Sequence, residues 1–169
     1  MWLFDWILNK HPSHHNVRTG VEALLSVIKS EDIEGGRYAA FGLANLAANA
    51  NHREKLVEEG AIVSLISLAC CEDINAQVQA IVALRGICIS PEYRAVVVRE
   101  GIMDPLVLLS RSEEIGVLRE VSSAINCLSS VEENKAEIAD RALCTVIGLM
   151  LSGNQVIFLD TCCVFLLQF

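Results

Sequence analysis

The sequence contains few aromatic residues and few basic ones. Aromatics make up 5% of the 169 residues and apolar residues 53%, so leucine, isoleucine, valine and alanine must form most of the core. Thirteen lysines and arginines stand against 21 aspartates and glutamates, which gives a formal charge of −8. Because a general nucleic-acid surface needs clustered lysine and arginine, this composition argues against one. The length fits one ordinary domain.

Motifs for catalysis and metal binding are also missing. There is no glycine-rich phosphate loop, HExxH or GxSxG, and the seven cysteines contain no CxxC spacing. Cys88 and Cys127 occupy small apolar positions, as buried free thiols do. An odd cysteine count without a signal peptide indicates a reducing compartment. We therefore expect a cytoplasmic, non-enzymatic protein with no metal and no cofactor.

One helical pattern recurs along most of the chain. Leu43, Leu84 and Ile125 follow one another at equal steps, and Leu65 and Leu106 are separated by the same step. In the last unit the step becomes shorter, because a turn has lost a residue while the helices keep their register. A period of 40 to 47 residues with two or three helices per unit is typical of armadillo and HEAT solenoids. The pattern therefore predicts stacked helical repeats.

Each full unit predicts three helices. The first is short and charged, with its apolar residues inward and Glu, Lys and Arg outward. The second is almost wholly apolar and is expected to be buried on all sides. Gly60 and Gly101 allow a sharp bend between them, whereas Arg141 takes that place in the third unit, where the bend must be made differently. The third helices are predicted at 38–48, 77–89 and 118–130, and the first and second helices of the last unit at 134–141 and 143–151.

Three segments resemble the armadillo motif, namely AAFGLANLA at 39–47, EEGAIVSLISL at 58–68 and REGIMDPLVLL at 99–109. The resemblance covers about residues 21–155 and is loosely similar to vacuolar and catenin-type armadillo adaptors. It implies an all-α fold, a right-handed α-solenoid of about three full repeats plus partial terminal ones. The expected organisation is an N-terminal cap or extension at 1–20 and an armadillo-repeat domain at 21–169, with a partial repeat at 21–33, repeats at about 34–74, 75–115 and 116–155, and a truncated repeat at 156–169.

The resemblance also nominates a binding face. In armadillo proteins the third helices line a groove that holds extended peptides, where an asparagine fixes the peptide backbone and an aromatic residue one turn earlier forms a pocket. Phe41 and Asn45 match that pair, with Arg37 and Tyr38 on the same side of the helix. A carboxamide suits this role because it offers both a donor and an acceptor to a peptide unit.

The later units depart from this motif. The second unit has Val82 and Gly86 at these two places, and the third has Ser123 and Cys127, so nuclear-signal binding of the importin type is not expected. Arg37, Arg85 and Arg119 are predicted on one side of successive layers, about 10 Å apart. This arrangement favours an acidic extended partner. The alternative for the single residues is a solvated polar face without a ligand. The remaining predicted groove residues are Gln79, Arg85, Arg119, Glu120 and Asn126.

The two ends of the chain differ from the middle. The first ten residues, MWLFDWILNK, are expected to pack as a cap on the first repeat. HPSHH at 11–15 is interpreted as a linker rather than a metal-binding tract. The apolar segment 156–169 contains Asp160 and is too short to span a bilayer. We expect a repeat cut off before its neighbour, in a fragment or splice form of a longer protein, and self-association through this end.

The main functional hypothesis is a protein–protein interaction scaffold or adaptor that holds a peptide segment of another protein along its third helices. One alternative is the substrate-recognition part of a larger ubiquitin-ligase-type protein, which needs a catalytic module outside these residues. Another is a membrane-attached, vacuolar-type adaptor held by MWLFDWILNK. The expected partners are other proteins, without nucleic acid and without a membrane.

Overall fold

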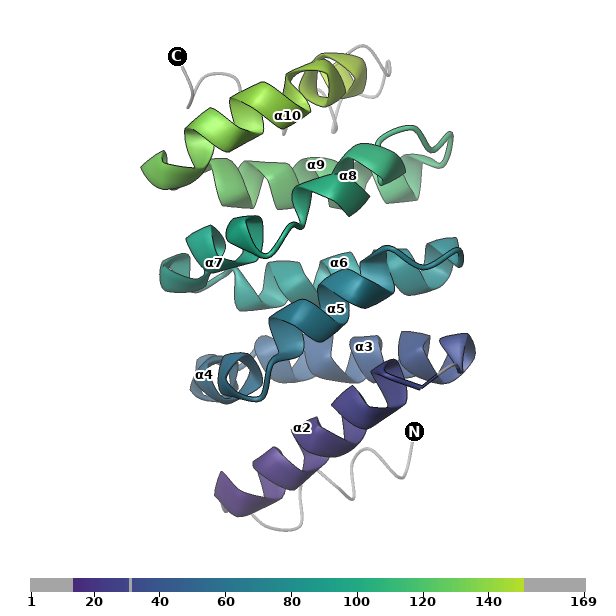
Figure 1. Cartoon of the computed structure of the whole chain (residues 1–169), viewed down its shortest axis with the longest axis vertical. Coiled ribbons are helices and arrows are strands. Elements are labelled where there is room, and N and C mark those ends of the chain that lie inside the picture. Colours follow the sequence, from purple (N-terminus) through teal and green to yellow (C-terminus); the bar gives the residue numbers. More distant parts are fainter. Residues whose placement is uncertain (1–13, 31, 151–169) are drawn as a thin grey trace.

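The protein is a stack of α-helices, which the computed structural model describes for residues 14–30 and 32–150 (Figure 1). The predicted N-terminal cap segment and the truncated repeat at 156–169 lie outside these residues, as does the apolar end expected to self-associate. No strand occurs among the described residues. The helices are α2 (His14–Ile28), α3 (Ile33–Ala47), α4 (Ala50–Glu58), α5 (Ala61–Ala69), α6 (Ile74–Ile87), the short 3-10 helix η1 (Pro91–Tyr93), α7 (Arg94–Arg99), α8 (Met103–Leu109), α9 (Ile115–Ser129) and α10 (Glu132–Met150).

The helices form repeated layers. In Figure 1, α3, α6 and α9 lie one above the other on one side of the stack, while α2, α5 and α8 cross the other side. Helix α3 packs on α6, and α6 packs on α9. These helices begin at Ile33, Ile74 and Ile115. The starts are separated by the same step as the apolar repeat in the sequence. The predicted all-α solenoid is confirmed.

The core consists of the residues that carry the repeat. Leu43, Leu84 and Ile125 are at most 1% exposed, so the predicted core positions are confirmed. The prediction that the second helices are buried on all sides is wrong, because Val63 of α5 is 58% exposed and Leu108 of α8 is 53% exposed. The reason is that α5 and α8 form the outer surface of the stack and have packing partners on their inner sides only (Figure 1).

Aspartate residues cap two of the three long stacked helices. Asp32 Oδ1 accepts a hydrogen bond from the Gly35 amide at 2.9 Å, and Asp73 Oδ1 accepts one from the Ala76 amide at 2.7 Å. Such a bond satisfies an N–H group that has no partner within the helix, and a carboxylate is favoured at the positive helix end. Glu114 precedes α9 in the same place but makes no side-chain cap bond.

Two glycines make the bends between the first and second helices. Gly60 has φ 78° and Gly101 has φ 100°, and no other described residue has a positive φ. This region is open to glycine because it has no Cβ, while other residues lose about 1–2 kcal/mol there. Gly60 separates α4 from α5, and Gly101 lies between α7 and α8. The prediction for these two glycines is confirmed.

The third unit has no such break. The helices predicted at 134–141 and 143–151 are one helix, α10, which continues through Arg141. The physical reason is that no glycine occupies this place, so nothing lets the backbone enter the left-handed region. The Arg141 guanidinium instead pairs with Glu137 at 3.4 Å and with Asp104 of α8. The side chain that replaces the glycine therefore links two helices.

Helix α2 begins earlier than the predicted partial repeat. It starts at His14 rather than at residue 21, so the linker interpretation of HPSHH is wrong for His14 and His15. No proline occurs between His14 and Ile28, and nothing in the backbone interrupts the helix there.

Candidate functional site

Helix α3 exposes two aromatic rings and an amide on one side. Tyr38 is 59% exposed and Phe41 is 53% exposed, and Asn45 is exposed as well. Steps of three and four residues place these side chains along the same face of the helix. Contiguous exposed apolar surface marks interaction sites more often than a single exposed residue does. The shared outward face is as predicted, and the binding role of these residues stays a prediction.

Arg37 contacts the neighbouring aromatic ring. Its Nη2 donates a hydrogen bond to the Tyr38 hydroxyl at 3.3 Å and lies 3.6 Å from the Glu34 carboxylate. The guanidinium carbon is 5.0 Å from the centroid of the Tyr38 ring, where the electron-rich face attracts a cation. The positive charge of Arg37 is therefore shared with groups of its own helix.

A cleft of about 300 Å³ lies between α6 and α9. We call it the α6–α9 cleft. It brings together four of the predicted groove residues, Gln79 and Val82 from α6 and Arg119 and Glu120 from α9. Its other lining residues are Ile74, Asn75, Val78, Glu114, Gly116 and Val117.

An ion pair joins the two helices beside this cleft. Arg85 Nη2 lies 3.0 Å from Glu120 Oε2, and Arg85 Nη1 donates a hydrogen bond to Ser123 Oγ at 3.2 Å. Glu120 Oε1 is also 4.0 Å from Arg119 Nε. Two arginines thus share one carboxylate, and three predicted groove residues bind one another across successive layers.

The three predicted groove arginines do not form one column. Arg37 and Arg119 are each the fifth residue of their helix, whereas Arg85 is the twelfth residue of α6. Seven residues correspond to about two helical turns, roughly 10 Å along the helix. Arg85 is paired with Glu120 and Arg37 with Glu34, while the Arg119 side chain is 61% exposed. The acidic extended partner stays a prediction.

In the second unit, the position equivalent to Asn45 is Gly86, and it is a site of close helix packing. A Cβ on Gly86 would lie 2.9 Å from the Cβ of Ala47 in α3, closer than such atoms approach in proteins. In the third unit the equivalent Cys127 donates its thiol hydrogen to the Cys88 carbonyl at 3.3 Å. Both positions are therefore used for contact with the preceding layer. Asn126, the last predicted groove residue, is half-buried on α9.

Arg53 and Arg94, which were not identified as functional residues from the sequence, hold the layers together. Arg53 is only 8% exposed, and it donates hydrogen bonds to the Ala47 and Ala48 carbonyls and to Ser90 Oγ in the next layer. Arg94, at the equivalent place of the next unit, makes the same set of bonds to the Cys88 and Ile89 carbonyls and to Ser130 Oγ. Their recurrence at the step of the apolar repeat is the sequence signal that identifies them.

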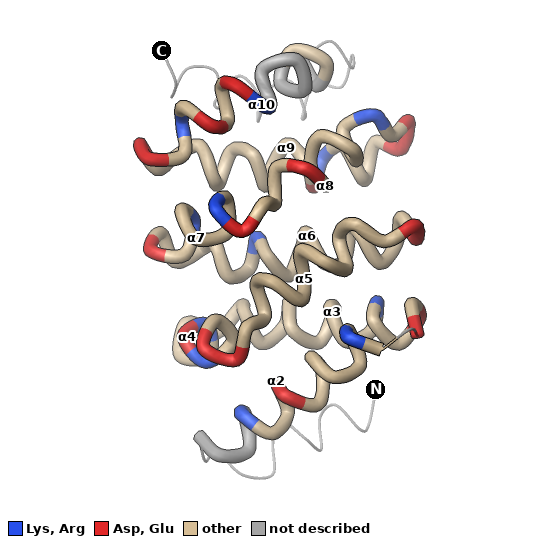
Figure 2. Tube along the Cα trace, in the orientation of Figure 1, with Lys and Arg blue, Asp and Glu red and all other residues tan. Residues whose placement is uncertain are grey.

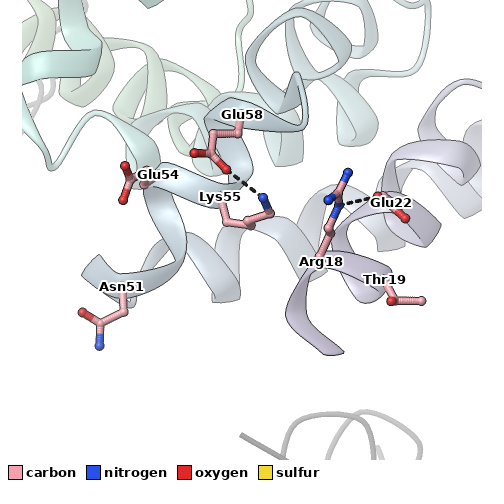
Figure 3. A pocket seen from close by; sticks show the side chains of 7 residues that line it. All are labelled: Arg18, Thr19, Glu22, Asn51, Glu54, Lys55 and Glu58. Carbon is pink, nitrogen blue, oxygen red and sulfur yellow. Dashed lines mark hydrogen bonds and ion pairs between the residues drawn. The ribbon is translucent and has the colours of Figure 1, made fainter. Parts of the chain in front are cut away.

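A larger polar cleft, of about 720 Å³, lies between α2 and α4 (Figure 3). Arg18 pairs with Glu22 at 2.9 Å and with Glu59 at 3.1 Å, and Lys55 pairs with Glu58 at 2.7 Å. The Lys55–Glu58 hydrogen bond raises the pKa of Lys55 and lowers the pKa of Glu58. Arg18 and Lys55 thus both have carboxylate partners, and the Arg18–Glu59 pair links α2 to the end of α4.

Charges of both signs occur in every layer. Figure 2 shows basic and acidic positions close together on or beside α2, α4, α7 and α10, while α5 has no charged position, so no layer of the described residues presents a uniformly basic surface. Among residues 14–30 and 32–150, no three histidine, cysteine, aspartate or glutamate side chains gather as metal ligands would. Within the same ranges, no helix has the length and hydrophobicity needed to cross a bilayer.

Four cysteines whose side chains the structure describes are free thiols, namely Cys70, Cys71, Cys88 and Cys127. Burial raises the pKa of the Cys88 thiol to about 12, which keeps it protonated at neutral pH. Since the thiolate is the nucleophile, Cys88 is unsuited to covalent chemistry and serves as a packing residue, as predicted.

No protein-family model matches the chain, and no curated protein sequence does either. Solved structures do match. An engineered protein superposes with a TM-score of 0.80 at 26% identity, over 88% of this chain and 62% of its own. This chain therefore spans less than two thirds of the length of that protein.

Designed armadillo repeat proteins have the same fold. One, computationally designed for modular peptide recognition, superposes with a TM-score of 0.81 at 20% identity, over 92% of this chain and 69% of its own. Another, in complex with the peptide (KR)4, gives 0.81 at 19% identity, over 99% of this chain and 80% of its own. The predicted armadillo-like repeat fold is confirmed. The likeness to vacuolar and catenin-type adaptors stays a prediction.

Proposed function

We propose that this protein is a non-enzymatic interaction scaffold that binds an extended segment of another protein across its third-helix face. This face is the row of exposed and half-buried side chains on α3, α6 and α9. Its members are Arg37, Tyr38, Phe41, Asn45, Gln79, Val82, Arg85, Arg119, Glu120, Ser123 and Asn126.

The observation that carries this proposal is that all three stacked helices present exposed or half-buried groove residues on that face. Tyr38, Phe41 and Asn45 are exposed on α3, and the α6–α9 cleft continues the face in the next two layers. Helices that pack at their usual separation put the α3 residues and the cleft roughly 15 Å apart, a distance that four or five residues of extended chain cover. Designed proteins of this fold recognise peptides, which supports a peptide segment as the partner of this chain.

The charges of the face favour recognition through amides and apolar groups. Arg37 and Arg85 both have carboxylate partners within the protein, at 3.6 Å and 3.0 Å. An acidic or basic partner must compete with these pairs, and exposed ion pairs contribute at most about 1 kcal/mol each. We therefore infer that binding depends weakly on salt. Free cysteines at four described positions support a reducing, cytoplasmic location.

The test uses peptides selected from a random dodecamer display library against the whole chain. The variant is Phe41→Ala combined with Asn45→Ala, and fluorescence anisotropy measures the Kd of the selected peptides. We expect the double variant to weaken binding at least tenfold, about 1.4 kcal/mol, because it removes an apolar contact and a backbone-binding amide.

The matched control is Val63→Ala with Ser67→Ala, on the exposed side of α5. This pair should leave the Kd within about twofold. Unchanged binding to the Phe41/Asn45 variant, or loss of binding in the control, would show that the third-helix face is not the binding surface.

A further inference from the structure

The α6–α9 cleft has an apolar floor. Val78 and Val82 of α6 line it together with Val117 of α9, which is 5% exposed, and Ile74 lies at the start of α6. Its volume of about 300 Å³ is at the lower end of the range for small-molecule pockets. The cleft thus has room for one large side chain and offers it branched aliphatic neighbours.

The charged group at the wall of the cleft is compensated. Glu120 is bound by Arg85 at 3.0 Å and faces Arg119 at 4.0 Å. A lysine or arginine entering the cleft must displace an existing partner to reach this carboxylate. An aspartate or glutamate meets Glu114 and Glu120 as like charges. A basic side chain meets Arg119 as a like charge, so a charged group of either sign encounters repulsion in this lining, and the aliphatic side chains favour an apolar group.

Two amide side chains complete the rim. Asn75 and Gln79 are one turn apart on α6, and both line the cleft. A carboxamide donates and accepts hydrogen bonds, which matches the N–H and C=O groups of an extended backbone. The rim therefore suits the main chain of a partner whose side chain points into the cleft.

We propose that the α6–α9 cleft is an anchor site for one leucine-sized apolar side chain of the extended segment. This inference rests on the proposed function and adds the chemical class that the partner must carry. The anchor lies one to two layers from Asn45, roughly 15 Å, which corresponds to about four or five residues of extended chain. The partner is thus a segment with a large apolar residue at that distance from the residue over α3.

Gly116 provides the test because it lines the cleft and its side-chain direction is open. Gly116 lines the cleft and a Cβ built on it meets nothing within 4 Å, so Gly116→Leu adds a large side chain at the cleft with no clash at its Cβ. Gly20 of α2 also has nothing within 4 Å, and Gly20→Leu is the matched control away from the cleft. Circular dichroism melting of both variants checks that each remains folded.

The probes are the dodecamers selected on the unmodified chain, measured by fluorescence anisotropy. We expect them to share leucine, isoleucine, methionine or phenylalanine at one position. Gly116→Leu should raise their Kd at least tenfold, while Gly20→Leu should leave it unchanged. Alanine at the shared peptide position should weaken binding to the unmodified chain at least tenfold, and this measurement needs no protein variant. The two changes together should reduce the binding free energy by less than the sum of their separate effects, because both remove the same contact.

Two outcomes overturn the inference, and they are distinguishable. If peptides depend on Phe41 and Asn45 but share a charged residue, or bind Gly116→Leu normally and tolerate alanine at every apolar position, the scaffold function holds and the anchor site is wrong. If no selected peptide depends on Phe41 and Asn45, the proposed function fails and the anchor site fails with it.

Discussion

At the scale of single residues, the buried Arg53 and the half-buried Arg94 show how a charged side chain stabilises a stack of thin layers. Arg53 and Arg94 each donate to two carbonyls at the end of a long helix and to a serine hydroxyl of the next layer. The carbonyl end of a helix is its negative pole, which favours a cation there. Asn134, 2% exposed, replaces them in the third unit and donates to the Leu128 carbonyl at 2.9 Å.

Replacement of Arg53 by alanine should therefore destabilise the protein. The change removes the donor to the buried Ala47 carbonyl and two part-buried hydrogen bonds, so we expect the free energy of unfolding to fall by about 2–3 kcal/mol. Urea unfolding monitored by circular dichroism measures this change. Arg99 is exposed at the end of α7, and Arg99→Ala should alter stability by less than about 0.5 kcal/mol. Equal effects of the two substitutions would contradict the role given to Arg53.

Residues of the core were predictable from the sequence, whereas the roles of the polar ones were not. Leu43, Leu84 and Ile125 keep a fixed spacing, and periodic apolar positions identify a helix face that must be buried. The sequence pattern places Arg53 in solvent, because a charged residue on an amphipathic helix normally faces water. The pairing of Arg85 with Glu120 joins residues 35 positions apart, and it depends on how α6 and α9 pack.

At the scale of helices, the glycine bends distinguish the first two units from the third, which has no such bend. Gly60 and Gly101 adopt positive φ and end a short helix, while α10 continues through Arg141. The sequence identified Arg141 as the exception, because it takes the place that the two glycines hold in the earlier units. The sequence did not show whether the two expected helices are separate or continuous. No proline or glycine near Arg141 indicates a break, and the repeat pattern alone predicted one. The start of α2 at His14 was not predicted either, because the repeat pattern begins only at residue 21 and no residue type marks the true start.

Gly60→Ala tests the bend directly. An alanine at φ 78° is strained, so we expect a loss of about 1–2 kcal/mol in the free energy of unfolding. Gly20→Ala is the control, because Gly20 is helical with open space around it, and alanine there should be neutral or stabilise the protein by up to about 1 kcal/mol. Chemical denaturation of both variants gives the comparison. A stable Gly60→Ala variant would mean that α4 and α5 do not need this bend.

At the scale of the whole molecule, the stack places one kind of helix along one side. Each layer contacts its neighbours, so stability arises from the interfaces between layers. This arrangement leaves α3, α6 and α9 with a side free of packing partners, where Phe41, Asn45 and the α6–α9 cleft lie in sequence. The position of this face followed from the repeat, but the cleft and its compensated charges required the structure.

The most direct measurement is a map of backbone amide chemical shifts in the chain, recorded by NMR while a selected peptide is added. Binding across the third-helix face predicts that the largest changes occur on the outward sides of α3, α6 and α9, and that residues around Val63 and Leu108 on the opposite surface are unaffected. Changes centred on α5 and α8, with α3, α6 and α9 unperturbed, would contradict the account.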